Sequence, residues 1–330
     1  MVRMTNNKLK ISKQKKQIIV TGGLGFVGQH LTQALIKHDY LPIVVDKLPS
    51  SSVKKVINRY NLKVNKDFIF LKGDIRNTKW LEKKLKKYRP SAVIHLAAIH
   101  FIPYCDEHRV ETIQVNVQGT QVLLELCKKM GIQKFIFAST AAVYKPSARP
   151  HSETDIVAPV DIYGASKKMA EDLILLYAKT LKLSPVILRL FNIYGPGDRN
   201  PHFIPLMVKQ IRKSKTIFHG NLQSIRDYVY VDDVVSAIML VLQKDKLKNT
   251  IYNLGTGIGY SGTQVIKTLC KILKRNVKHE ISKKQLRSVD RKKLLANTEA
   301  LSGELQWSPK YHLHKGLNSL LEKNERANFY

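Results

Sequence analysis

The sequence predicts a doubly wound α/β fold, in which helices cover both faces of a parallel sheet, joined to a smaller C-terminal α/β lobe. Short β-branched runs alternate with longer amphipathic segments from residue 17 onward, which predicts the sheet. A glycine-rich turn directly after the first run supports the same fold. After Leu190 the predicted elements become shorter and are separated by loops rich in glycine, proline and asparagine, which predicts the second lobe.

Six apolar runs are expected to form the strands. They cover residues 17–21, 42–46, 68–71, 92–97, 134–139 and 185–190. Between them, apolar residues recur three and four positions apart, the period of a helix that is buried on one face. The clearest helices are expected at residues 26–37, 78–88, 110–130 and 162–181.

Composition excludes several classes of protein. With 330 residues, 44% of them hydrophobic, the chain can build a large core, which excludes a disordered protein and a small disulfide-stapled scaffold. Cys105, Cys127 and Cys270 form no CxxC pair, so we predict no disulfide framework and no metal site, as for a protein of the reducing cytoplasm. No apolar run approaches the roughly 18 residues of a membrane span.

The charge balance is unusual, because 56 lysine and arginine residues against 25 aspartate and glutamate residues give a formal net charge of +31. Two interpretations stay open: a solvated basic surface, or a polyanionic partner such as RNA or an anionic membrane. The lysines are spread over every predicted helix and do not form one stripe with aromatic residues. We therefore expect a solvated surface and no nucleic-acid partner.

A dinucleotide site is predicted where the first strand ends. The segment GGLGFVG places Gly22, Gly25 and Gly28 directly before a helix. Such glycines permit a tight turn, let the backbone approach a pyrophosphate, and let the helix pack closely on the strand. Asp46 ends the second strand, where a carboxylate binds ribose hydroxyls and repels a 2′-phosphate, which favours NAD over NADP. These features are typical of the Rossmann fold.

A catalytic constellation is predicted at the same edge of the sheet. Tyr163 and Lys167 lie four residues apart at the start of a predicted helix, and therefore on one face of it. A free tyrosine loses its proton at about pH 10, but a neighbouring ammonium favours the phenolate and makes tyrosine a usable base. Thr140 follows the fifth predicted strand, where its hydroxyl could bind the same substrate oxygen.

Two further polar residues have two interpretations each. Asn116 lies inside the long helix expected at 110–130, where it is either a buried structural group, which is favoured, or part of a proton relay. Asp74 follows the third predicted strand, where it either approaches an adenine ring or simply begins the next helix.

Taken together, the motifs resemble the extended short-chain dehydrogenase/reductase superfamily, in its branch of nucleotide-sugar epimerases and dehydratases. The resemblance covers roughly residues 17 to 320 and rests on TGGLGFVG, GDIRN, HLAA, NVQGT, STAAVY, YGASK, LRLFNIYGPG and RDYVYVDDV. It implies a homodimer that keeps NAD bound, with Tyr163 as the base and Lys167 and Thr140 assisting. The cofactor contacts that it implies are Gly22, Gly25, Phe26, Val27, Gly28, Asp46, Asp74, Ile75, Leu96, Ala97, Ala98, Asn116, Tyr163 and Lys167. The substrate contacts that it implies are Thr140, Asn192, Arg226, Arg287 and Leu294, and His100 is a further candidate because its loop is expected to face the substrate.

Within this branch the chain most resembles the UDP-glucose 4-epimerases. The 4,6-dehydratases of the family carry an Asp-Glu pair directly after the strand-five hydroxyl, because elimination of water needs an acid and a base. Here these positions are Ala141 and Ala142. The resemblance therefore implies inversion of C4 of a UDP-hexose or UDP-N-acetylhexosamine through a transient 4-keto sugar, in polysaccharide or glycoconjugate biosynthesis. A dehydratase or reductase of the same family, and a non-catalytic RNA-binding member of the fold, stay open as alternatives.

The chain departs from the family pattern near the expected substrate. Lys145 replaces the usual glycine after VY, and the loop at 100–105, HFIPYC, is bulkier than usual. His100 is therefore either a packed residue, which is favoured, or a group that recognises another sugar or transfers a proton.

The expected domain boundaries follow from these assignments. Residues 1–16 are basic and lack an apolar core, so we expect a disordered leader and not a secretory signal. Residues 17–184 are expected to form the NAD-binding domain, which residues 225–245 rejoin. Residues 185–224 and 246–330 are expected to form the lobe that binds the nucleotide sugar.

Overall fold

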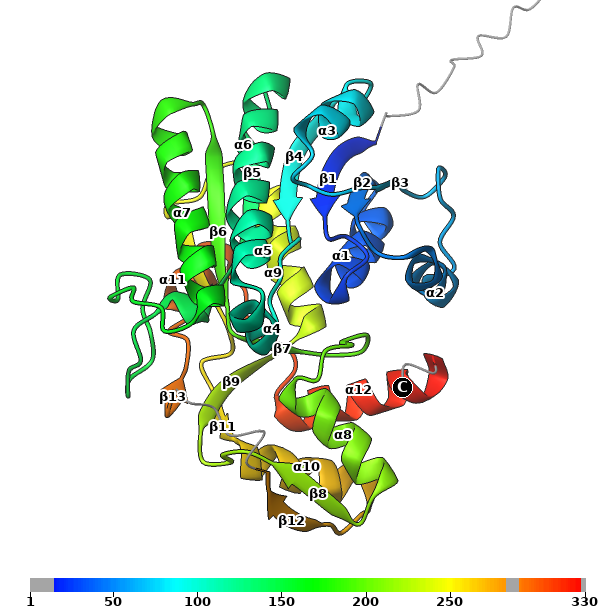
Figure 1. Ribbon diagram of the computed structural model, residues 1–330, viewed down its shortest axis with the longest axis vertical. Coiled ribbons are helices and arrows are strands. Elements are labelled where there is room, and N and C mark those ends of the chain that lie inside the picture. The colour runs from blue at the N-terminus through cyan, green and yellow to red at the C-terminus, as the bar shows by residue number, and fades with distance from the viewer. Residues whose placement is uncertain (1–14, 283–290, 328–330) are drawn as a thin grey trace, which may run out of the picture.

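Seven parallel strands form the central sheet of the structure, a computed structural model that describes residues 15–282 and 291–327. The strand order is β10-β6-β5-β4-β1-β2-β3 (Figure 1). The bounds are β1 (Lys16–Thr21), β2 (Tyr40–Asp46), β3 (Ile69–Lys72), β4 (Pro90–His95), β5 (Lys134–Thr140), β6 (Ser184–Leu190) and β10 (Ile251–Leu254). The doubly wound α/β fold is confirmed, and the six predicted strands lie close to their expected positions. Of the expected leader, residues 1–14 lie outside the described residues and Lys16 already begins β1.

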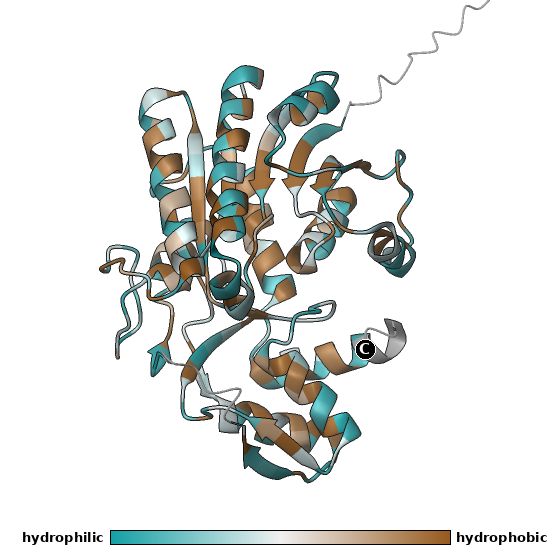
Figure 2. Ribbon diagram, in the orientation of Figure 1, coloured by the Kyte–Doolittle hydropathy of each residue, from teal (hydrophilic) through white to brown (hydrophobic). Residues whose placement is uncertain are grey.

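Two hydrophobic layers cover the two faces of this sheet, whose strands are largely apolar (Figure 2). Along β1, Ile18 and Val20 belong to one layer and Ile19 to the other, because alternate side chains of a strand point to opposite faces. The first layer contains α1 (Phe26–Lys37), α2 (Ser50–Tyr60), α9 (Val231–Gln243) and α11 (Glu299–Leu305). The second contains α3 (Thr78–Leu85), α6 (Gly119–Met130) and α7 (Ile162–Thr180). With both faces covered, ligands can reach this sheet at its ends, and in such folds they bind at the carboxyl end.

A second, smaller lobe lies at the carboxyl end of the sheet (Figure 1). One small sheet in it contains β7 (Asn192–Tyr194), β9 (Ile225–Tyr230), β11 (Gly259–Ser261) and β13 (Lys293–Leu294), and a separate pair contains β8 (Thr216–His219) and β12 (Lys278–Ile281). Its helices are α8 (Phe203–Lys213), α10 (Gly262–Leu273) and α12 (Leu313–Ala327). They pack around a separate core that includes Met207, Leu269 and Leu317. Among the described helices of both lobes, none has the length and apolarity needed to cross a membrane.

The strand pairing differs from the expected boundaries between the lobes. β6 and β10 pair with each other inside the large sheet, with Ile187 opposite Ile251, although residues from 185 and from 246 onward were expected in the small lobe. Of residues 225–245, only the helix α9 returns to the large sheet, because β9 pairs with β7, β11 and β13. A strand as short as β10 carries too little periodicity to be recognised in a sequence.

The helix expected at 110–130 is interrupted in the structure. It consists of α5 (Arg109–Ile113), a π-helical turn (Gln114–Gln118) and α6, and the short α4 (Ile102–Glu107) precedes it. Asn116 lies at the centre of the π-helical turn. Such turns insert an extra residue into a helix and occur frequently at functional sites. Periodicity does not reveal this one, because apolar residues continue on both sides of it.

A buried ion pair joins α7 to β6. Arg189 donates from Nε and Nη2 to the two carboxylate oxygens of Glu171, at 3.1 and 2.8 Å, and the two residues are 3% and 1% exposed. Glu171 also accepts a hydrogen bond from the Ser139 hydroxyl. Arg189 Nη1 donates to Tyr144 Oη at 3.0 Å, and Tyr144 donates to Asn253 Oδ1 at 2.7 Å. The network therefore links α7 to β10 across β5 and β6.

Arg189→Met is expected to lower the free energy of unfolding by about 3–5 kcal/mol, because the Glu171 carboxylate stays buried without its counter-charge. Removing both charges, in Arg189→Met combined with Glu171→Leu, is expected to recover most of this loss, since an apolar pair needs no desolvation of charge. Urea unfolding of the three proteins measures both effects. A double variant no more stable than Arg189→Met would contradict this explanation.

Candidate active site

The turn after β1 brings main-chain atoms so close together that only glycine fits. Gly22 has a φ of +67°, in the left-handed region, and a Cβ on it would lie 2.8 Å from the Ala97 nitrogen. A Cβ on Gly28 would lie 2.0 Å from the Gly22 carbonyl oxygen. A Cβ on Gly25 would meet one described atom within 4 Å, the Gly22 carbonyl oxygen at 3.2 Å. The side of the turn that Gly25 faces is therefore open. The turn therefore forms a cradle of main-chain atoms.

The N-terminus of α1 opens into this cradle. Gly25 is its N-cap residue, and no side chain in the described part of the protein caps it. The first N–H groups of a helix have no partner within the helix, and together with the helix dipole they bind an anion such as a pyrophosphate. Asp46, at the end of β2, accepts from the N–H groups of Leu24 at 3.0 Å and Leu48 at 3.1 Å, which fixes a carboxylate beside the turn. These residues fit the predicted dinucleotide.

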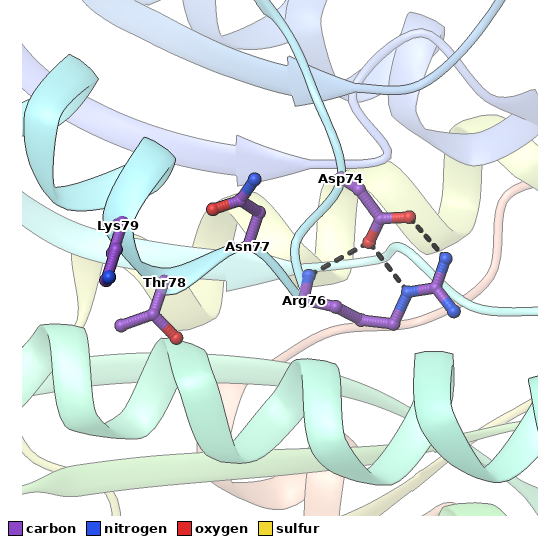
Figure 3. A pocket seen from close by; sticks show the side chains of 5 residues that line it. All are labelled: Asp74, Arg76, Asn77, Thr78 and Lys79. Carbon is purple, nitrogen blue, oxygen red and sulfur yellow. Dashed lines mark hydrogen bonds and ion pairs between the residues drawn. The ribbon is translucent and has the colours of Figure 1, made fainter.

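Asp74 lies in a surface hollow that is also lined by Arg76, Asn77, Thr78 and Lys79 (Figure 3). Arg76 donates to both carboxylate oxygens of Asp74, from Nε at 3.0 Å and from Nη2 at 2.7 Å, and this pair lowers the pKa of the Asp74 carboxyl. The N-cap of α3 is Asn77, whose side chain accepts from the Trp80 N–H at 3.0 Å. Asp74 therefore does not cap that helix, and its approach to an adenine ring stays a prediction.

The three predicted catalytic side chains lie at the end of β5 and the start of α7. Thr140 is 8% exposed. Burial raises the pKa of Tyr163, and a hydrogen bond with Thr140 acts in the opposite direction. Lys167 is 2% exposed, and its Nζ lies 3.9 Å from the centre of the Phe137 ring. Burial lowers the pKa of the Lys167 ammonium to about 7, against the effect of the Glu171 charge. Tyr163 therefore contacts Thr140, and a buried lysine that titrates near neutrality lies about one helical turn further along α7.

Asn116 binds two neighbouring segments at once. Its Nδ2 donates to the Ile99 carbonyl oxygen at 2.9 Å, and its Oδ1 accepts from the Ile99 N–H at 2.8 Å. Nδ2 also donates to Ser166 Oγ at 2.9 Å, and Ser166 donates to the Tyr163 carbonyl oxygen at 2.7 Å. Both N–H bonds of the amide are used in these contacts. Asn116 therefore holds the segment after β4, with the expected cofactor contacts at 96–98, against the helix that carries Tyr163.

His100 is exposed and contacts a loop of the small lobe. Its Nε2 lies 3.1 Å from Asn200 Nδ2, and its ring centre lies 5.7 Å from that of His202. The His202 Nδ1 lies 2.7 Å from Oδ2 of Asp198, whose side chain is buried. His202 and Asp198 were not predicted as site residues, although their spacing of four residues is a signal that could have found them.

The other predicted substrate residues lie in the small lobe. Asn192 is the exposed first residue of β7. Arg226, in β9, donates from Nη1 to the carbonyl oxygen of Arg291 at 2.6 Å. Leu294, in β13, is 8% exposed and packs against the turn that follows β5. Arg287 lies outside the described residues.

Two further residues, which were not predicted from the sequence, complete this region. Asp161 is the N-cap of α7, and its Oδ1 accepts from the Gly164 N–H at 2.7 Å. Arg291 binds the other oxygen of that carboxylate. An aspartate three residues before a helical N–H is a known N-cap signal that could have found Asp161. No local signal could have found Arg291, because it lies 130 residues away from this partner.

Gly28→Ala is expected to destabilise the protein by about 3 kcal/mol and to remove the bound dinucleotide, because the added methyl group meets main-chain atoms that cannot move aside. Urea unfolding and the absorbance of nucleotide released from the purified protein measure the two effects. Gly303→Ala is the control, since a Cβ there meets no described atom within 4 Å, and it is expected to stabilise α11 by about 1 kcal/mol. Full dinucleotide content in Gly28→Ala would rule out the cradle.

Lys167 is expected to make the stability of the dinucleotide-free protein depend on pH. The pKa of Lys167 is about 7 in the folded protein and about 10.4 in the unfolded chain. Between these two pH values the unfolded chain binds a proton that the folded protein does not bind, so the free energy of unfolding rises with pH. Lys167→Met is expected to abolish that contribution, and Lys168→Met, at the neighbouring position, to retain it. Urea unfolding at pH 7, 8 and 9 checks this, and parallel curves for wild type and Lys167→Met would contradict it.

Comparison with known proteins identifies the family. Residues 18–255 match the NAD dependent epimerase/dehydratase family. The chain is 34% identical over 282 residues to dTDP-D-glucose 4,6-dehydratase of Dictyostelium discoideum. The aligned residues cover 81% of this chain but only 64% of that relative, which is less than two thirds of its length. It is 32% identical over 304 residues to UDP-glucuronate 4-epimerase of Thermodesulfobacterium geofontis (strain OPF15), which covers 91% of this chain and 93% of that relative.

Solved structures agree with this family over most of the chain. UDP-glucose 4-epimerase from Thermotoga maritima, with UDP-glucose, superposes with a TM-score of 0.85 at 30% identity and covers 94% of this chain and 99% of its own. UDP-glucuronic acid 4-epimerase from Bacillus cereus, with UDP-glucuronic acid and NAD, superposes with a TM-score of 0.84 at 31% identity and with the same coverage. The chain therefore belongs to the NAD-dependent epimerase/dehydratase family.

Proposed function

We propose that this protein is an NAD-dependent epimerase that inverts C4 of a UDP-sugar through a transient 4-keto sugar. The observation that carries the proposal is the pair Ala141 and Ala142, which are 1% and 6% exposed and directly follow Thr140. Elimination of water needs an acid and a base beside the sugar, and these two positions supply methyl groups. A 4-keto sugar formed here is therefore better suited to reduction than to dehydration. The chain is similar both to UDP-sugar 4-epimerases and to dTDP-D-glucose 4,6-dehydratases, so the choice between the two reactions rests on these two alanines.

The catalytic residues suit a reversible oxidation at C4. The glycine turn and Asp46 would hold NAD, which when bound would supply the acceptor and donor of a hydride at C4. Tyr163 accepts the proton of the C4 hydroxyl while Thr140 holds the same oxygen, and Tyr163 gives the proton back when the ketone is reduced. Lys167, on the same face of α7, favours the phenolate when it carries its charge. The proton and the hydride return to the oxygen and carbon that they left, so there is no net redox change.

Inversion requires the ketone to present its other face before the hydride returns. We assign the diphosphate to Arg226 and Asn192 in the small lobe, since a guanidinium can bind a phosphate through two parallel hydrogen bonds. A nucleotide held there tethers the sugar while leaving the ring free to turn over. In this division the small lobe supplies binding and the end of the large sheet supplies the chemistry.

We also propose that the protein is a homodimer that associates through α6 and α7. Met169 and Leu176, both on α7, are 48% and 56% exposed although they are apolar. A helix that already packs on the sheet through its buried face has these residues available for a second contact.

Wild-type protein is expected to switch the C4 configuration of a UDP-sugar to equilibrium, with no added cofactor and no change in nicotinamide absorbance. Proton NMR on a panel of UDP-, dTDP- and GDP-sugars measures this.

Tyr163→Phe is expected to lower kcat by about 100-fold or more while NAD stays bound, because the glycine turn that holds NAD is unchanged. Tyr177→Phe is the control, because this tyrosine lies on the same helix and its hydroxyl donates to Glu125 near the surface.

Two other results would overturn the proposal. A 6-deoxy-4-keto product would show that the protein is a dehydratase whose acid and base lie outside positions 141 and 142. No product from any sugar, with NAD bound, would favour a non-catalytic role, and RNA binding that weakens steeply with added salt would then identify it.

A further inference from the structure

One arginine near the small lobe contacts both elements that carry the catalytic hydroxyls. Arg291 is 8% exposed, and it donates from Nη1 and Nη2 to Asp161 Oδ2 at 3.3 and 3.2 Å. Its Nη2 also donates to the Ala142 carbonyl oxygen at 3.0 Å. Asp161 precedes Tyr163 by two residues, and Ala142 follows Thr140 by two residues. One guanidinium therefore bridges the start of α7 and the turn that ends β5.

The groups that Arg291 binds are themselves fixed to the catalytic elements. Asp161 uses its other oxygen, Oδ1, to cap α7 through the Gly164 N–H at 2.7 Å. On the other side, Thr140 Oγ1 accepts from the Ala142 N–H at 3.1 Å. A Cβ on Gly164 would lie 2.5 Å from the Ala142 oxygen, so helix and turn are in direct contact at this point. The bridge therefore acts where the two catalytic elements meet.

The main chain of the same arginine reaches the proposed diphosphate site. The Arg291 carbonyl oxygen accepts from Arg226 Nη1 at 2.6 Å, and the same nitrogen donates to the Ile225 carbonyl oxygen at 2.9 Å. The side chain of Arg291 thus faces the catalytic elements while its carbonyl group holds the proposed phosphate ligand.

We propose that Arg291 is a positioning residue, whose side chain holds Thr140 against Tyr163 and whose main chain links both to Arg226. It acts through the elements that it joins and not on the reacting atoms. Arginine suits this role because its planar fork presents several N–H donors to separate acceptors, whereas lysine is a single point charge. The inference rests on the proposed function, because the relative position of Thr140 and Tyr163 affects turnover only if Tyr163 takes part in the reaction.

Arg291→Met, tested in the NAD-loaded protein, is expected to lower kcat by about 10- to 100-fold, because a misplacement of about 1 Å costs about 100-fold. KM is expected to change little, because the main-chain contact with Arg226 remains. Arg291→Lys is expected to recover only part of the rate. Arg149→Met is the matched control: it breaks another arginine–aspartate pair, with Asp155 at 2.8 Å, in which the arginine side chain is 68% exposed, and it is expected to leave both parameters unchanged.

The pH dependence of kcat/KM shows whether Arg291 acts through its pairing with Asp161 or whether its loss simply disturbs the structure. Burial raises the pKa of Tyr163, the Thr140 hydroxyl lowers it, and the charges of Cys105 and Asp161 raise it. Arg291→Met leaves Asp161 uncompensated, so the acid limb of the kcat/KM profile is expected to move to higher pH. Asp161→Asn keeps a capping side chain but removes the negative charge, so that limb is expected to move to lower pH. Shifts in the same direction would overturn the proposal.

Hydrogen exchange tests the bridge without relying on turnover. In Arg291→Met the amides of Ala142 and Gly164 are expected to exchange faster than in wild type, and in Arg149→Met they are expected to exchange as in wild type. Unchanged exchange, or unchanged kcat in Arg291→Met beside an active wild type, would refute the role of Arg291. An inactive wild type with faster exchange in Arg291→Met would refute the proposed function but retain the bridge.

Discussion

The proposed catalytic site depends on one close approach, in which the first turn of α7 lies directly against the turn that ends β5. Gly164 permits the contact, because any side chain there would collide with the Ala142 carbonyl oxygen. The approach sets the position of Thr140 relative to Tyr163, and one strand, β4, separates β5 from β1, the strand that leads into the glycine turn. Parallel strands make this arrangement possible, since the functional segments begin where neighbouring strands stop at one edge.

Charge around this contact is organised differently from charge on the surface. The chain carries +31 overall, yet buried charges beside the contact occur in pairs, Glu171 with Arg189 and Asp161 with Arg291. Lys167 is less well compensated, because the carboxylate that acts on it already binds Arg189. Its proton is therefore weakly held. Buried pairs contribute little net stability once desolvation is counted, so their value here lies in the geometry that they fix.

The sequence predicted those features that depend on residues close together in the chain. The glycine turn, the strand runs and the four-residue step from Tyr163 to Lys167 follow from steric exclusion and from the periods of strand and helix, which one sequence displays. The strand β10, the π-helical turn around Asn116 and the bridge through Arg291 were missed. Each depends on how distant segments meet: the partners of Arg291 lie 130 and 149 residues away from it, and no spacing rule reaches so far.

The route of the chain between the two lobes also has a mechanical consequence. Within the described residues it passes between them five times, from β6 to β7, β9 to α9, β10 to β11, β13 to α11 and α11 to α12. Domains that swing about a hinge do so on a few flexible residues, whereas here a rotation would have to bend five connections together. Five connections therefore oppose a rotation of one lobe against the other, so a ligand that contacts both lobes would meet a spacing that the route of the chain largely sets.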